Sequence, residues 1–105
     1  MKHIIDSIDK INSYIAEVNE NKFLKSNLLQ SGVIRELEII GEAVKMLSPE
    51  LKERYSFIPW RIIAGMRDKL IHNYFGVDNE AVWKTVNEDL PVFKKNISKI
   101  IKENR

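Results

Sequence analysis

Hydrophobic residues recur along the first half of this chain at alternating steps of three and four, the spacing of one face of an α-helix. The first apolar stripe consists of Ile4, Ile8, Ile11, Ile15 and Val18. The second begins after about residue 27 and consists of Val33, Leu37, Ile40, Val44 and Leu47. Because only a short polar stretch at residues 19–22 separates the stripes, we expect two long amphipathic helices that pack antiparallel.

A short third helix is indicated by the residues that follow the second stripe. Ser48, Pro49 and Glu50 are typical of a helix start, with a capping hydroxyl, a proline at the first helical position and a carboxylate in the first turn. This helix is expected to end near Tyr55.

Two further helices complete the pattern. One is predicted to start at Pro59 and to stop at Gly76, and the other is capped by Asp78. The apolar stripe of the first is Trp60, Ile63, Arg67, Leu70 and Tyr74. The stripe of the last is Val82, Val86, Leu90, Phe93, Ile97 and Ile100. Pro91 is expected to kink this last helix or to break it into two.

The elements together predict an all-α protein, a four-helix bundle of the up-and-down type with one short additional helix. No segment alternates apolar and polar residues as a strand does, and no repeat or Gly/Pro cluster suggests a second domain. We therefore expect residues 1–105 to form a single helical domain. A chain of 105 residues with 44% hydrophobic content can bury a real core.

Composition excludes several kinds of chemistry. The chain has no cysteine, which removes disulfides, thiolate zinc sites and cysteine nucleophiles, and is compatible with a reducing cytosol. No apolar run approaches the roughly 20 residues needed to cross a bilayer, so we expect a cytoplasmic protein without a membrane segment. The net charge of +2 is ordinary, although residues 45–72 hold six Lys/Arg against three Asp/Glu.

Arg67 occupies a position in its stripe where an apolar residue is expected. Such an arginine extends its guanidinium to water, pairs with a carboxylate, or lines a cleft or subunit interface, and the first two cases are the commoner ones. The residues after it make the third case worth considering. Arginine can hold a phosphate, His72 can move a proton near neutral pH, and Tyr74 offers a hydroxyl that another enzyme can modify.

On one straight helix, Arg67 and Tyr74 lie on nearly the same face, whereas Arg67 and His72 point roughly 140° apart. The geometry improves if the helix frays after Ile71. It also improves if two copies cross at a two-fold axis, so that each His72 meets the Arg67 of the other copy.

The residue string around this segment resembles the HepT family of HEPN-domain proteins. The matching runs are Ile40-Gly41-Glu42-Ala43, Ser48-Pro49-Glu50, Ile58-Pro59-Trp60-Arg61, Ile63-Ala64-Gly65-Met66-Arg67, Leu70-Ile71-His72, Tyr74-Phe75-Gly76-Val77-Asp78, Val82-Trp83, Thr85-Val86 and Asp89-Leu90-Pro91. The likeness extends from about residue 33 to residue 97, while the first helix fits mainly by its pattern. An arginine and a histidine five places apart would mean little alone, but the whole string is highly specific.

The resemblance implies a HEPN-like bundle that forms a homodimer with the active site at the interface. It implies a ribonuclease toxin whose partner is an antitoxin, a small MNT-type nucleotidyltransferase. The family's arginine and histidine match Arg67 and His72, and the polar residue after the arginine matches Asp68. The tyrosine to which the antitoxin is understood to transfer AMP matches Tyr74.

RNA carries its own nucleophile in the 2′-hydroxyl, so its cleavage needs only proton transfer and charge stabilisation, without a metal or cofactor. His72 is the candidate general base or acid, and Arg67 is the candidate for binding the scissile phosphate and stabilising the transition state. Asp68 is expected to orient one of them, and Lys69 is a weaker candidate for binding substrate. The expected products carry a 2′,3′-cyclic phosphate and a 5′-hydroxyl.

A second interpretation uses the same scaffold without chemistry. The dimeric bundle would then bind nucleotide or RNA through Arg67 and Lys69, or act as the partner of a nucleotidyltransferase, without cleaving anything. Loss of metal-free RNA cleavage in His72→Ala distinguishes the two interpretations.

Overall fold

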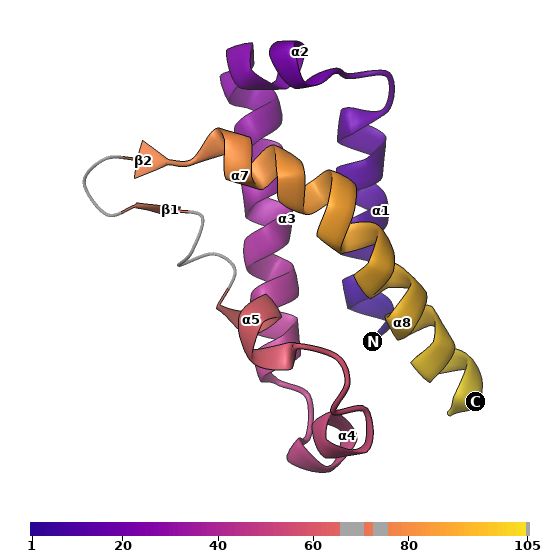
Figure 1. Ribbon diagram of the computed structural model, residues 1–105. Helices are drawn as coiled ribbons and strands as arrows, with labels where there is room; N and C mark the ends of the chain where they lie inside the picture. Colours follow the sequence, from indigo (N-terminus) through magenta and orange to yellow (C-terminus); the bar gives the residue numbers. More distant parts are fainter. Residues whose placement is uncertain (66–70, 73–75, 105) are drawn as a thin grey trace.

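The computed structural model describes residues 1–65, 71–72 and 76–104 of the chain. The described elements are α1 (Lys2–Ile15), α2 (Glu20–Lys25), α3 (Asn27–Lys45), α4 (Pro49–Arg54), α5 (Trp60–Ala64), β1 (Ile71–His72), β2 (Gly76–Val77), α7 (Asn79–Lys84), the π-helical turn η2 (Thr85–Asp89) and α8 (Leu90–Glu103). Figure 1 shows helices throughout, with two short strands at one side. The all-α class expected from the sequence is confirmed, and the described part forms a HEPN-like helical bundle.

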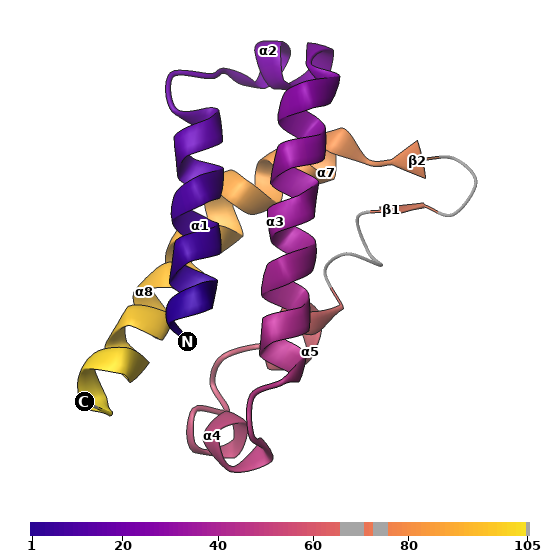
Figure 2. The ribbon, with the colours of Figure 1, turned by 180° about the vertical axis from the view of Figure 1, so that it is seen from behind.

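The two long helices predicted from the first two stripes are α1 and α3, which lie side by side and run in opposite directions (Figures 1 and 2). The segment between them contains the short helix α2, which begins in the polar stretch and which the sequence analysis did not anticipate. Asn19 caps α2 by accepting a hydrogen bond from the Lys22 backbone N–H at 2.8 Å. Ser26 caps α3 in the same way, accepting from the Leu29 N–H at 3.2 Å. Side-chain caps therefore make this sharp corner possible.

The core lies where α1, α3 and the α7–α8 helix meet. Most of its fully buried members belong to the predicted stripes, and Phe23 and Ile58 add to them. They include Ile4, Ile8, Ile11, Phe23, Val33, Leu37, Ile40, Val44, Ile58, Val82, Val86, Ile97 and Ile100. The α7–α8 helix crosses α3 and then descends beside α1, so the two termini lie at the same end of the molecule (Figure 1). No helix among the described residues is long and apolar enough to span a bilayer.

Short helix α4 begins and ends where the sequence predicted. The Ser48 hydroxyl accepts from the Leu51 N–H at 3.2 Å, and Pro49 takes the first helical position. Tyr55 follows the helix, and its hydroxyl lies 3.2 Å from the Glu103 carboxylate. This hydrogen bond ties the end of α4 to the last turn of α8.

The predicted irregularity at Pro91 takes the form of the π-helical turn η2, which lies immediately before it between α7 and α8. The backbone N–H of Leu90 donates to the carbonyl of Thr85, one residue further back than in an α-helix. A proline has no N–H to donate and its ring crowds the carbonyl four residues earlier. A wider turn accommodates both effects while the helix continues to Glu103.

The helix predicted from Pro59 to Gly76 is wrong over part of its length. Helix α5 ends at Ala64, where the N–H of Gly65 closes the last turn on the Arg61 carbonyl at 3.0 Å. Ile71–His72 pairs antiparallel with Gly76–Val77, contrary to the expectation that the chain contains no strand. The helix predicted over residues 59–76 is therefore represented, in the part described, by α5 alone. Glycine is costly inside a helix, by about 1 kcal/mol relative to alanine, and favours its end.

Candidate active site

The predicted site residues divide into two groups. Arg67, Asp68, Lys69 and Tyr74 lie outside the described residues. The backbone of His72 is described and forms the end of β1, where it is paired with Gly76. The roles given to these five residues therefore stay predictions, and the structure contributes the frame that holds the two ends of their segment.

At the first end, α5 is packed closely against α3. An ideal Cβ atom built on Gly41 of α3 would lie 3.2 Å from the carbonyl oxygen of Ala64 and 3.7 Å from that of Ile63. No side chain larger than hydrogen fits there without displacing backbone. The last turn of α5 is thus fixed on α3, and Arg67 follows Ala64 by only three residues.

The start of α5 is fixed by Trp60, whose side chain is 8% exposed. Its indole N–H donates to the backbone carbonyls of Lys52 and Tyr55 at 3.2 Å and 3.1 Å. Its ring lies edge-on to Phe93 of α8, with centroids 6.1 Å apart. Trp60 therefore joins α4, α5 and α8 as a packing residue, which is the role that a tryptophan with a satisfied N–H usually has.

At the second end, β2 leads into α7 through Asp78. The Asp78 carboxylate accepts from the Ala81 N–H at 3.1 Å and caps α7, as the sequence predicted. Trp83 of α7 then packs on Phe23 of α2, with ring centroids 5.2 Å apart and planes inclined by 35°. The segment that contains the candidate residues thus leaves one fixed helix and enters another.

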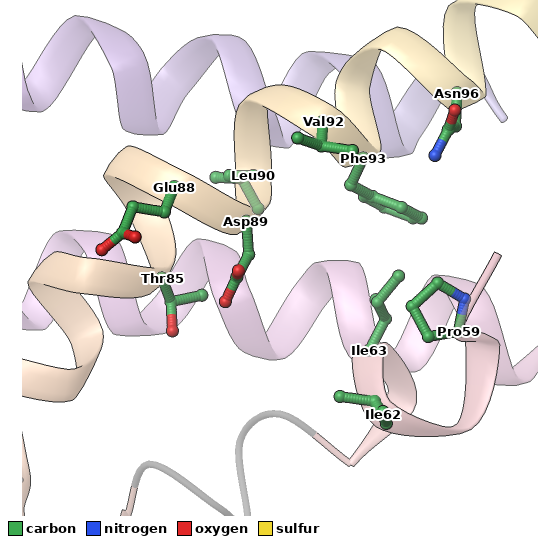
Figure 3. Close-up of a pocket in the computed structure, with 10 residues that line it drawn as sticks. All are labelled: Pro59, Ile62, Ile63, Thr85, Glu88, Asp89, Leu90, Val92, Phe93 and Asn96. Atoms are coloured by element: carbon green, nitrogen blue, oxygen red, sulfur yellow. The ribbon is translucent and has the colours of Figure 1, made fainter.

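A cleft of about 410 Å³ opens beside this frame, between α5 and the η2–α8 helix (Figure 3). Its apolar lining includes Ile62, Ile63 and Phe93, and Figure 3 shows Phe93 projecting from α8 toward Ile63 and Pro59. Glu88 and Asp89 add carboxylates at its η2 end. Carboxylates repel phosphate, so the described lining of this cleft does not favour RNA.

The sequence analysis did not single out this cleft, although one signal was present. Ile62 and Val92 are apolar residues off the predicted stripes, and their side chains are 63% and 61% exposed. Off-stripe apolar residues on two helices that meet in space mark an apolar surface, but only the fold brings these two helices together.

Glu36 is a second feature that the sequence analysis missed. It is 6% exposed on the inner side of α3, and its Oε1 atom accepts no hydrogen bond from any residue that the structure describes. The signal was its place beside Leu37 and one turn from Val33, in the stripe that faces the core. Elsewhere in the described part, no group of three or more His, Cys, Asp or Glu side chains could hold a metal ion.

Comparison with known proteins supports the family resemblance inferred from the residue string. A family model described as "Ribonuclease HepT-like" matches residues 4–100. A "Probable ribonuclease HepT" from Thermococcus cleftensis is 45% identical over 102 residues, which cover 97% of this chain and 93% of that protein. A protein of Caldanaerobacter subterraneus named "Putative RNase" is 38% identical over 105 residues, which cover 100% of this chain and 94% of that protein.

A longer relative from Methanocaldococcus jannaschii is named "Gamma-glutamylcyclotransferase and putative RNase". It is 47% identical over 103 residues, which are 98% of this chain but 46% of that protein. This chain therefore spans about half the length of that relative. No solved structure matches the chain significantly.

Proposed function

Because this chain belongs to the HepT-like ribonuclease family, we propose that it is a metal-independent endoribonuclease and the toxin of a toxin–antitoxin pair. The single observation that carries the proposal is the family match over residues 4–100, which includes every candidate residue from Arg67 to Tyr74. Relatives named as ribonucleases and similar over nearly their whole length support it.

The proposed reaction uses the 2′-hydroxyl of RNA as the nucleophile. His72 takes the proton from this hydroxyl, the oxygen attacks the adjacent phosphorus, and the bond from phosphorus to the 5′-oxygen breaks. The leaving 5′-oxygen takes up a proton, for which His72 of a second copy is the candidate donor. The products are a 2′,3′-cyclic phosphate and a 5′-hydroxyl, so no water is consumed in this step.

Arg67 is proposed to bind the scissile phosphate through two parallel hydrogen bonds and to stabilise the extra negative charge of the transition state. Lys69 adds a second cation for the substrate. Asp68 would repel phosphate on its own, so its proposed role is to orient Arg67 or His72 by a hydrogen bond. A homodimer with the site at its interface supplies two sets of these groups to one substrate.

Inhibition is proposed to occur at Tyr74, through transfer of AMP to its hydroxyl by an MNT-type nucleotidyltransferase antitoxin. The modification adds a bulky nucleotide and a negatively charged phosphodiester seven residues from Arg67. The added phosphate can occupy the site of the RNA phosphate and exclude substrate by charge and by volume. Inhibition then requires no unfolding of the domain.

The test of cleavage is incubation of a mixed RNA pool with the purified chain in EDTA, with analysis of the product ends. We expect cyclic-phosphate ends from the wild-type chain and from His3→Ala, and none from His72→Ala. His3 is the matched control because it is the only other histidine and is exposed on α1. Cleavage that persists in His72→Ala refutes the role of His72. No cleavage by a folded, unmodified wild-type chain favours the second interpretation, in which the dimer binds nucleotide or RNA, or a nucleotidyltransferase, without cleaving anything.

The test of inhibition is incubation of the chain with an MNT-type nucleotidyltransferase and ATP, followed by mass spectrometry. Tyr74→Phe is expected to retain RNA cleavage and to show no mass increase from AMP. The control is Tyr14→Phe, at a partly exposed tyrosine of α1, which is expected to cleave RNA and to gain the mass of AMP as the wild-type chain does. Full modification of Tyr74→Phe would show that the acceptor lies elsewhere.

A further inference from the structure

The cleft between α5 and the η2–α8 helix has the size and the lining of a small-molecule site. Its volume of about 410 Å³ lies within the range of about 300–1,000 Å³ that is typical of ligand pockets. Phe93 and Ile63 give it an apolar interior. Two further apolar side chains line it from opposite helices, and Ile62 and Val92 are 63% and 61% exposed. A ligand whose apolar part covers these side chains removes their surface from water, which favours binding.

Negative charge gathers at the η2 end of the cleft, where Glu88 and Asp89 each provide a carboxylate. Asp89 follows Thr85 by four residues, about one helical turn, so their side chains lie on the same side of the helix. Figure 3 shows the Asp89 carboxylate beside Thr85. Neither carboxylate forms an ion pair with another described residue, and the Asp89 side chain makes no capping hydrogen bond to α8. Both carboxylates can therefore accept hydrogen bonds from a ligand.

Thr85 is an independent indication of a ligand at this end. It is only 8% exposed and lines the cleft, and Figure 3 shows its hydroxyl oxygen pointing away from the helix backbone. In the part of the chain that the structure describes, this hydroxyl has no hydrogen-bond partner. Buried polar groups are as a rule hydrogen-bonded, and a threonine within a helix often bonds the carbonyl one turn back. Since Thr85 does not, its oxygen is available to a group that enters the cleft.

We propose that this cleft binds a small organic monocation, in which one ammonium or guanidinium group is attached to an apolar ring or chain. The cation lies at the η2 end and donates hydrogen bonds to the Asp89 carboxylate and the Thr85 hydroxyl. The apolar part lies over Phe93, between Ile62 and Val92. Because Asp89 and Phe93 are four residues apart, about 6 Å along the helix, a short aliphatic linker is enough to join the two parts of the ligand.

The same groups disfavour other classes of small ligand. An anion is repelled by the carboxylates of Glu88 and Asp89. A neutral apolar molecule takes water from these carboxylates without giving them hydrogen bonds in return. A polyamine carries a second cation to the opposite end of the cleft, where Lys95 and Lys99 are exposed within one turn of Asn96. One cation at one end of an apolar body is the arrangement that matches the lining.

The chain contains its own reporter of binding in this cleft. The ring of Trp60 lies edge-on to Phe93, with centroids 6.1 Å apart, and Phe93 lines the cleft. Trp83, the other tryptophan of the chain, packs on Phe23 instead. In NMR spectra of the isotope-labelled chain, the two indole N–H signals therefore distinguish a ligand in the cleft from a general effect on the protein.

The experiment is an NMR titration of the full wild-type chain with three probes that share a phenyl ring. They are 2-phenylethylamine, which is a cation at neutral pH, 2-phenylethanol, which is neutral, and 3-phenylpropanoate, which is an anion. We expect the amine to shift the Trp60 signal saturably and to leave the Trp83 signal in place. We expect the amine to bind at least about fivefold more tightly than the alcohol, because it gains charge-assisted hydrogen bonds, and the anion to give no saturable shift.

Three variants separate the polar end of the cleft from its apolar interior. Asp89→Asn is expected to weaken binding of the amine by at least about fivefold and to leave binding of the alcohol unchanged. Val92→Ala, at a side chain that is 61% exposed, is expected to weaken binding of the amine and the alcohol to a similar extent. Glu80→Gln is the matched control, since it neutralises an exposed carboxylate of α7 outside the described lining and is expected to bind as the wild-type chain does.

An amine that gives no saturable shift, or that binds no more tightly than the alcohol or the anion, overturns the proposal, and this comparison requires no variant to fold. Equal binding of the amine by Asp89→Asn and the wild-type chain overturns it as well. So does a Trp60 signal that changes with protein concentration alone and does not respond to the amine, because another copy of the chain then covers the cleft. The titration involves no RNA, so its failure leaves the proposed function in place, and a chain that binds the amine without cleaving RNA contradicts the proposed function alone.

Discussion

The contact between Gly41 and the end of α5 makes a sharp prediction about how the site segment is held. Replacing Gly41 by alanine adds one methyl group to α3, at a point 3.2 Å from the Ala64 carbonyl oxygen. The added methyl carbon is bonded directly to the backbone of α3, and the Ala64 oxygen is part of the backbone of α5. Neither atom can therefore rotate out of the contact. The crowding can be relieved only by moving α5 away from α3.

Two opposing terms set the magnitude. Alanine is favoured over glycine within a helix by about 1 kcal/mol. Overpacking a fixed position costs about 1–3 kcal/mol, which here applies because a backbone carbonyl cannot rotate out of the way as a side chain does. We therefore expect Gly41→Ala to lower the free energy of unfolding by up to about 2 kcal/mol.

Gly32 provides a matched control on the same helix. A Cβ atom there would lie 3.3 Å from Cε2 of Tyr14, a ring on α1 that is 36% exposed and can tilt aside. The helix preference for alanine then remains without the full cost of the contact. Because the ring gives way, Gly32→Ala is expected to raise the free energy of unfolding by about 1 kcal/mol.

The assay is urea unfolding followed by helical circular dichroism, with both variants compared to the wild-type chain. The difference between the two alanine variants is expected to be about 1–3 kcal/mol in favour of Gly32→Ala. Equal stability of the two variants, or a more stable Gly41→Ala, would refute the reasoning that α5 is held by backbone contact with α3.

Two further predictions concern hydrogen bonds that join elements. Gln30→Ala removes a buried amide that donates to the carbonyls of Phe23 and Leu24 at 3.0 Å each. Urea unfolding is expected to show that the free energy of unfolding falls by about 1–3 kcal/mol. An unchanged free energy would contradict this. Trp60→Phe keeps a ring against Phe93 but leaves the Lys52 and Tyr55 carbonyls without the indole donor. The same measurement is expected to show that the free energy of unfolding falls by about 1–3 kcal/mol. A Trp60→Phe protein as stable as the wild-type chain would show that these carbonyls find other donors.

The sequence predicted well wherever structure depends on neighbours in the chain. The caps at Ser48 and Asp78 were read from residue type and position, because a capping side chain needs only a backbone N–H three residues later. The stripes of α1, α3 and α8 were read from spacing and became the core. For the candidate site, residue types and a family resemblance indicated RNA cleavage, and the family match supports that class of activity.

Tertiary structure decided where α5 ends. A stripe that continues through Gly65 fits a long helix, and only the packing of α5 on α3 and the pairing of Ile71–His72 with Gly76–Val77 show that the chain takes another course. Spacing cannot reveal this, since it records which residues share a face and not what that face meets.

The sequence by itself therefore determined the helical class, the caps and the chemical groups available to the site, because these depend on residues close together in the chain. Only the tertiary structure decided the cleft between α5 and α8 and the exposure of Ile62 and Val92. These depend on contacts between segments about 30 residues apart, whose relative placement is set by the packing of the whole core.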